Sequence, residues 1–185
     1  STSGDGGGFD LDGGTGESVL QYNYSYENRS SGVLLWEYGS RLPLADNVVR
    51  YNVSVNDGEA GIRFGQSGGQ GVMRIEVYHN LVVNDRFPCV WGQTDGVRDV
   101  RIRNNVFIGP RGGEMLRDRG GVRYEGNCWW APDGRFEAGG IIGFEAWARA
   151  TGQESSGGQP VGLFADPGLA NPGGIPRVTD PHVLA

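Results

Sequence analysis

One alternating pattern of apolar and polar residues recurs along the first two thirds of the chain. Each copy carries an asparagine, and the residues three before, one after and three after it are apolar or aromatic. This period of two predicts a β-strand with one buried face. The copies, whose asparagines follow one another at intervals of 29, 28, 25 and 22 residues, are segments 20–26, 49–55, 77–83, 102–108 and 124–130.

A second predicted strand begins eight or nine residues after each of the first four asparagines. These strands are segments 32–36, 61–65, 88–92 and 113–117, and segment 8–12 fits the same register. Strands that recur at this interval, separated by short Gly-rich turns, are typical of a solenoid whose coils stack about 4.8 Å apart. The sequence therefore predicts an all-β solenoid of five to six coils.

The recurring asparagine has a physical explanation in such a stack. Its amide carries a donor and an acceptor, so identical residues at one turn can hydrogen-bond to each other from coil to coil. The alternative interpretation is N-glycosylation, because Asn23, Asn28 and Asn52 each lie in an Asn-X-Ser sequence. Two of these three are ladder positions that should point inward, so the ladder is the favoured interpretation.

The strands QYNYSYEN and VVRYNVSVNDG resemble those of the right-handed parallel β-helix superfamily of pectate-lyase-like proteins. The tail, FEAWARATGQESSGGQPVGLFADPGLANP, is similar to the closing segment of many bacterial carbohydrate-active proteins of that fold. The resemblance covers residues 8 to 175 and implies a secreted, extracellular protein that handles polysaccharide. It does not single out an activity, because the superfamily includes polysaccharide lyases, glycoside hydrolases, binding modules and phage tailspikes.

We expect a single domain with two parts. Residues 1–130 form the coils, and residues 131–185 form a C-terminal capping segment with a loop, a short helix and an Asp-Pro turn. The helix is predicted over 144–150, ends at Gly152 and uses its aromatic residues to cover the last coil. The start shows no comparable cap, so we expect a monomer or part of a longer polypeptide.

The composition of the chain mainly excludes some classes of partner. The 185 residues carry 16 arginines, no lysine and 22 acidic residues, for a net charge of −6. This balance argues against nucleic acid and anionic membranes as partners, and no apolar run is long enough to span a membrane. No signal peptide is present, so a secreted protein would appear here in its mature form. Cys89 and Cys128 fall two coils apart, too far for a disulfide, and are predicted to be small core residues.

Alternation also predicts which side chains point outward. On the second predicted strands, Asp10 and Asp12 share a face with residues from each later coil. In order along the stack these are Leu34 and Trp36, Arg63 and Gly65, Val90 and Gly92, and Met115 and Arg117. At the ends of these strands we expect a polar column of Glu37, Gln66, Gln93 and Asp118. The exterior column of the first predicted strands is Gln21, Arg50, Tyr78 and Arg103.

Together these columns predict one lateral groove that binds a polysaccharide. Sugars are bound by flat apolar faces and by paired donors and acceptors, and the groove offers both. The predicted substrate-binding residues are Trp36, Arg63, Gln66, Tyr78, Gln93, Arg50 and Asp118. Because the chain is acidic, a neutral plant or microbial glycan is the favoured ligand over a polyanion.

Three carboxylates are candidates for catalysis. Cleavage of a glycosidic bond by acid and base needs one protonated and one ionised carboxyl group, and Asp10, Asp12 and Glu37 are the predicted catalytic residues. No cofactor is required for this chemistry. Asp5, Asp10 and Asp12 also form a candidate Ca²⁺ site, and a plain solvated surface is the third interpretation of the aspartates.

Other functions stay open beside hydrolysis. A polysaccharide lyase would use Arg63 to hold a uronate, a binding module would use the groove without chemistry, and a structural solenoid would use neither. His79 and His182 are far apart in sequence, and no His/Cys cluster has zinc spacing. His79 precedes a ladder asparagine, where a role in the turn is favoured.

Overall fold

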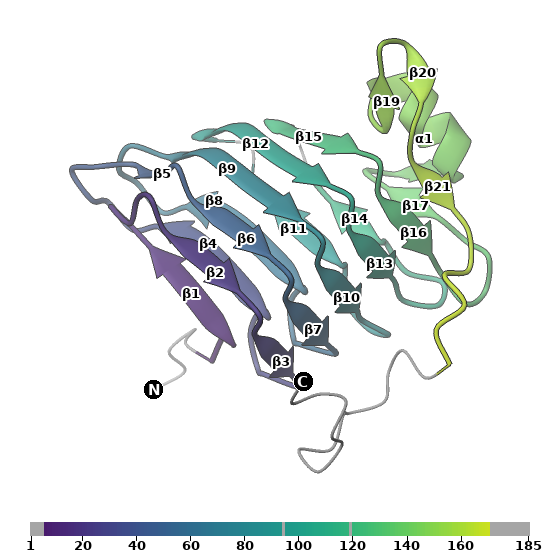
Figure 1. Cartoon of the computed structure of the whole chain (residues 1–185), viewed down its shortest axis with the longest axis horizontal. Coiled ribbons are helices and arrows are strands. Elements are labelled where there is room, and N and C mark those ends of the chain that lie inside the picture. The colour runs from purple at the N-terminus through teal and green to yellow at the C-terminus, as the bar shows by residue number, and fades with distance from the viewer. Residues whose placement is uncertain (1–5, 94, 119, 171–185) are drawn as a thin grey trace.

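The computed structural model describes residues 6–93, 95–118 and 120–170, which wind into a parallel β-solenoid of about four turns (Figure 1). Each turn contributes one strand to each of three parallel sheets, named here A, B and C. The fold class is the one that the sequence predicts. The count of turns is lower than predicted. After residue 138 the chain leaves the regular winding for an antiparallel strand pair and a helix, and residues 163–164 then return to a parallel sheet.

Sheet A contains β1 (Phe9–Asp12), β4 (Val33–Glu37), β8 (Ile62–Gln66), β11 (Val90–Gly92), β14 (Leu116–Arg117), β17 (Glu137–Ala138) and antiparallel β18 (Ile141–Ile142). Sheet B contains β2 (Val19–Gln21), β5 (Leu44–Ala45), β6 (Val48–Arg50), β9 (Val72–Tyr78), β12 (Val97–Arg103) and β15 (Val122–Glu125). Sheet C contains β3 (Tyr24–Tyr26), β7 (Val53–Val55), β10 (Leu81–Val83), β13 (Val106–Ile108), β16 (Cys128–Trp130) and β21 (Leu163–Phe164).

Each predicted first strand is in fact two strands that meet at a corner, so the prediction of one strand with one buried face is wrong. The residue before the ladder asparagine is left-handed, with φ of 57° at Tyr22, 54° at Tyr51 and 54° at His79. This conformation turns the chain from sheet B into sheet C. Inward residues therefore lie three before and two after the asparagine, and the apolar residues one and three after it point outward.

The asparagine ladder is confirmed. The side-chain oxygen of Asn52 accepts hydrogen bonds from the backbone N–H of Asn23 at 3.1 Å and from its Nδ2 at 2.9 Å. The same pair of bonds joins Asn52 to Asn80, Asn80 to Asn105 and Asn105 to Asn127. Each rung thus satisfies a buried amide and the backbone at the corner, where the sheet hydrogen bonds are interrupted.

The inner faces of the three sheets share one hydrophobic core. Leu35 and Phe64 enter it from sheet A, Val77 from sheet B, and Phe107 and Trp129 from sheet C, and all five are fully buried. Cys89 also lies in this core, as predicted. Cys128 does not: it lies on the outer face of sheet C, since it pairs with Val106 one residue past the corner.

The C-terminal end of the core is covered by α1 (Phe144–Thr151), which confirms the predicted helix and its end at a left-handed Gly152. Trp147 packs against Tyr124 and Trp129, with ring centroids 5.9 and 6.1 Å apart. A small hairpin of β19 (Ser155–Ser156) and β20 (Gln159–Pro160) follows. In the described part of the chain, α1 is too short to cross a bilayer and no helix is long and apolar enough to do so. Residues 171–185 of the predicted capping segment lie outside the described residues.

Candidate functional site

The outer face of sheet A holds the aspartates of β1 and a stack of larger side chains. Parallel pairing places Asp10 beside Leu34 and Asp12 beside Trp36, as predicted, and Leu34 beside Arg63. The next predicted positions are wrong by one residue: Trp91, and not Val90, pairs with Arg63 and points outward. Val90 and Met115 are instead buried in the core, and the outward file continues from Trp91 to Arg117.

Arginine and tryptophan side chains stack on one another across this face. The Arg63 guanidinium carbon lies 4.6 Å from the ring centroid of Trp36 and 4.4 Å from that of Trp91, and Arg117 lies 5.2 Å from Trp91. Glu59 forms an ion pair with Arg63. Stacking of this kind is worth about 0.5–2 kcal/mol per pair, so it fixes the rings. It also occupies ring faces, so the apolar surface left for a sugar at Trp91 is its edge and rim.

A cavity of about 610 Å³ opens beside Trp91. It is lined by Gln66, Gly68, Trp91, Gly92, Gln93, Asp95 and Arg117. Gly65 is needed at its edge, because a Cβ there would lie 2.8 Å from both the Trp36 ring and Oε1 of Gln93. The cavity therefore gathers two amides, an indole, a carboxylate and a guanidinium. Gln66 and Gln93 belong to the predicted binding residues. Arg117 was predicted on this face but not as a binding residue, and Trp91 and Asp95 were missed.

Glu37 does not join this face. It follows outward-pointing Trp36, so its side chain enters the interior, where it is 0% exposed. Its Oε1 accepts the N–H groups of Gly39 and Ser40 at 2.8 and 2.6 Å, and within the described residues Oε2 has no hydrogen-bond partner. Glu37 and the pair Asp10 and Asp12 thus lie on opposite sides of sheet A, and the structure does not bring them together.

The four residues of the predicted polar column, Glu37, Gln66, Gln93 and Asp118, do not all lie in one register. Glu37 pairs in register with Gln66, but Gln93 lies beside Gly65 and Asp118 beside Gly92. Asp118 accepts a hydrogen bond of 3.1 Å from the Tyr124 hydroxyl. Burial raises the pKa of Tyr124 well above its ordinary value, so this phenol stays protonated and donates.

The exterior column of Gln21, Arg50, Tyr78 and Arg103 is confirmed by the strand register, but it lies on sheet B. Arg50 donates to Gln21 at 2.8 Å and to the Tyr78 hydroxyl at 3.0 Å, and Arg103 lies 4.6 Å from the Tyr78 ring centroid. Sheets A and B bury their inner faces in the same core, and Figure 1 shows the strands of sheet B in front of those of sheet A. Their outer faces therefore do not form the single groove that the sequence analysis predicts.

An aromatic stack follows the corner between sheets B and C. The rings of Tyr22 and Tyr51 are 5.3 Å apart and 7° from parallel, and those of Tyr51 and His79 are 5.3 Å apart and 28° from parallel. His79 thus takes the corner position that its place before Asn80 predicts. Tyr51 stacks on both Tyr22 and His79, whereas Tyr22 ends the stack and is 74% exposed.

The calcium interpretation concerns Asp5, Asp10 and Asp12. Asp10 and Asp12 are exposed on β1, while Asp5 lies outside the described residues. Among the residues that the structure describes, no three His, Cys, Asp or Glu side chains gather closely enough to hold a metal ion.

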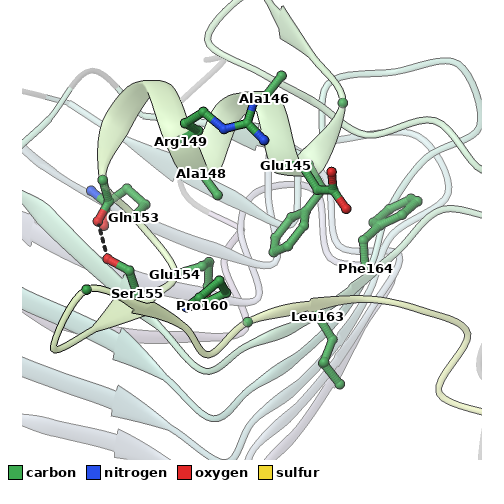
Figure 2. A pocket seen from close by; sticks show the side chains of 15 residues that line it. Glu145, Ala146, Ala148, Arg149, Gln153, Glu154, Ser155, Pro160, Leu163 and Phe164 are labelled. Carbon is green, nitrogen blue, oxygen red and sulfur yellow. Dashed lines mark hydrogen bonds between the residues drawn. The ribbon is translucent and has the colours of Figure 1, made fainter.

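A second cavity, of about 840 Å³, lies at the C-terminal end between α1, the β19–β20 hairpin and β21 (Figure 2). Phe144, Ala148 and Phe164 contribute apolar walls. Glu154 also lines it and is 2% exposed, but its carboxylate is occupied: it accepts hydrogen bonds from Asn127 and from Nε1 of Trp129. Burial raises the pKa of Glu154. The Glu154 carboxylate therefore serves the fold.

Comparison with models of known protein families, with curated proteins and with solved structures finds no match to this chain.

Proposed function

We propose that this chain binds a neutral polysaccharide along the outer face of sheet A, with the cavity beside Trp91 as the principal subsite. The observation that carries the proposal is the set of groups around that cavity. Gln66 and Gln93 offer amide N–H donors, and Asp95 and Arg117 offer one carboxylate and one guanidinium. Gln66 Oε1 is buried, and Gln93 Oε1 already accepts the Gln66 backbone N–H at 3.3 Å. Sugar hydroxyls pair with such groups, and sugar C–H groups can contact the edge of the Trp91 ring, whose faces Arg63 and Arg117 cover.

The shape of the face favours a linear polymer. Its side chains repeat at the strand spacing of about 4.8 Å, so five strands give a track about 20 Å long from Asp10 to Arg117. A polymer lying along this track would meet one outward side chain of this file from each successive strand. The overall charge of −6 disfavours a polyanion.

We also propose that the protein is extracellular and is related to pectate-lyase-like β-helix proteins. What supports both is the sequence pattern of asparagine corners and the closing segment, together with a parallel β-solenoid built on those corners.

Hydrolysis is the second candidate function. It is favoured by Asp10 and Asp12, which point to the same side of β1 at one end of the track. Glu37 lies on the other side of the sheet and is not part of this candidate. A lyase is less well supported, because Arg63 is already held by two indoles and by Glu59.

One panel separates these functions. The protein is run in native gels that contain xylan, mannan, β-glucan or pectin, and parallel incubations are assayed for reducing ends and for unsaturated products. Retardation without products supports the binding proposal. Reducing ends that disappear in Asp12→Asn, with retardation kept, would replace it with hydrolysis. Neither retardation nor products on the whole panel would contradict both.

A further inference from the structure

The first coil of the solenoid has three sheet edges without a neighbour. Sheets A, B and C begin with β1, β2 and β3 of this coil, and among the described residues no strand pairs with their outer sides. An edge strand presents unpaired backbone N–H and C=O groups, which form a template for another strand. β2 and β3 also contain no charged residue and no proline, which commonly block such pairing. The first coil is therefore open to a further layer of strands.

The hydrophobic core is incompletely covered at the same end. Leu11 and Leu20 occupy the core positions of the first coil but are only partly buried. Their partners in the next coil, Leu35 and Val49, are 0% exposed. A layer that packs on the first coil would therefore remove apolar side chains from water.

Two further side chains of this coil lack a contact that their equivalents in the next coil make. Oδ1 of Asn52 accepts two hydrogen bonds from Asn23, whereas no residue that the structure describes donates to Oδ1 of Asn23. Tyr22 stacks on Tyr51, and because the rings of successive coils stack, its other face is directed away from the next coil. Both side chains thus have a polar or aromatic contact still to make at this end.

The opposite end of the solenoid is closed (Figure 1). There α1 covers the core and antiparallel β18 ends sheet A. The edge of sheet B is covered by two side chains and backbone that follow α1. Gln153 accepts the N–H of Tyr124 and donates to the carbonyl of Val122, both at 2.8 Å, and the N–H of Glu154 donates to the carbonyl of Tyr124 at 2.8 Å. Head-to-tail stacking of copies is therefore blocked, and only two first coils can meet.

We propose that the first coil is the interface of a dimer, in which a second copy of this chain packs head to head with its own first coil. Because both partners use the same surface, the interface is two-fold and the assembly stops at two copies. The coil comprises the 24 residues from Phe9 to Gly32, since Val33 pairs with Phe9. A stable interface takes about 20–30 residues from each partner, so one coil is large enough. This dimer replaces the monomer expected from the sequence and is independent of the proposed glycan site.

The charges of the first coil give the dimer a distinctive salt dependence. The coil carries four acidic residues and one arginine, namely Asp10, Asp12, Glu17, Glu27 and Arg29. Two copies that meet here bring like charges together, and added salt screens their repulsion. We therefore expect the dissociation constant to fall between about 0.05 and about 0.5 M NaCl. A dimer that salt weakens would be held by ion pairs and would contradict this interface.

Sedimentation velocity of the full chain tests the proposal. The wild type should change from monomer to dimer between about 1 and about 100 µM and form nothing larger. Val19 and Tyr22 are each more than half exposed on the first coil, so Val19→Asp/Tyr22→Asp should fold and weaken the dimer at least about tenfold. Ile142→Asp/Leu163→Asp is the matched control, because these residues are also more than half exposed but lie at the closed end, and it should dimerise like the wild type. A wild type that stays monomeric at the upper concentration, or one that forms larger assemblies, would overturn the proposal.

A second measurement needs no variant. Hydrogen exchange of the wild type, followed by mass spectrometry at the same two concentrations, reports on the backbone N–H groups of the first coil. Peptides within residues 9–26 should exchange at least about threefold more slowly at the higher concentration, because pairing protects the strand edges, and peptides within 141–164 should not change. Equal exchange of 9–26 at both concentrations, or protection of 141–164 instead, would contradict head-to-head packing.

Discussion

Glu154 accepts at the end of the solenoid the hydrogen bonds that Asn127 would otherwise donate to a further asparagine. Its Oε2 accepts the Asn127 backbone N–H at 3.0 Å and its Oε1 accepts Nδ2 at 2.8 Å. Every earlier rung of the ladder is an asparagine amide, and the last acceptor is a carboxylate. A carboxylate accepts from both donors and has no N–H that would need a next rung, so the ladder can end inside the protein.

Substitution of Glu154, the last acceptor of the ladder, should destabilise the protein. Glu154→Ala leaves the two donors of Asn127 and the Trp129 Nε1 without their acceptor, and unsatisfied buried donors cost about 1–3 kcal/mol each. We expect a loss of about 3 kcal/mol or more in the free energy of unfolding, measured by urea denaturation. Glu154→Gln keeps one acceptor oxygen and should lose less. Equal losses for the two variants would show that hydrogen bonding at this position is not what matters.

The same residue predicts a pH dependence. Burial raises the pKa of Glu154 above its ordinary value of 4.5, so between that value and the raised one the folded state binds a proton that the unfolded state has released. The contribution of this group to stability is therefore fully present below 4.5 and falls as pH rises through the folded pKa. Stability of Glu154→Gln, relative to wild type, should increase over this range. A constant difference would exclude the effect.

The middle of the ladder should be as sensitive as its end. Asn80 is 4% exposed, accepts two hydrogen bonds from Asn52 and donates to Asn105. Asn80→Ala should destabilise the protein by about 2–4 kcal/mol in urea denaturation. Asn104→Gly is the matched control, because this exposed corner residue has φ of 53°, which glycine adopts readily, and Gly126 fills the equivalent corner. Similar losses in both variants would argue against the ladder as the source of stability.

The arginine between the two indoles gives a prediction for the sheet A face. Arg63→Lys keeps the charge but removes the flat guanidinium that lies between Trp36 and Trp91. We expect a change in tryptophan fluorescence and a loss of about 1–2 kcal/mol in stability. Arg103→Lys, at a residue that stacks on the single ring of Tyr78, should cost less. A larger loss at Arg103 would contradict the importance of the double stack.

The asparagine ladder was predictable from the sequence. An asparagine that recurs among apolar residues at the repeat spacing can hydrogen-bond to its equivalents in the neighbouring coils. The corner was not predictable from the alternation of apolar and polar residues. Apolar residues lie on both sides of Asn52 and Asn80, so the pattern does not show that the inward positions shift by one residue at the corner. Trp91 was misassigned by one residue because Pro88, Cys89 and Val90 are all apolar, so alternation there is ambiguous. One signal for Glu154 was present: it follows Asn127 by 27 residues, within the spacing of the repeat.

The site was less predictable than the fold for a related reason. Alternation correctly placed Asp10, Asp12, Trp36 and Arg63 on one outer face. It could not tell that Arg50 and Tyr78 stand on a different sheet, because that depends on the corner. Alternation also could not predict that Glu37 points inward at the end of β4, because a carboxylate at a strand end is expected to be exposed to solvent. Its two backbone N–H partners come from the turn that follows.

The most direct test of the account is a comparison of glycan affinity in two variants by titration calorimetry, with a polysaccharide that retards the wild type in gels. Trp91→Ala removes the indole of the sheet A cavity, and Tyr78→Ala removes an arginine-stacked ring from sheet B. The account predicts at least a tenfold weaker affinity for Trp91→Ala, equivalent to about 1.4 kcal/mol, and an unchanged affinity for Tyr78→Ala. Weaker binding in Tyr78→Ala with full affinity in Trp91→Ala would contradict it.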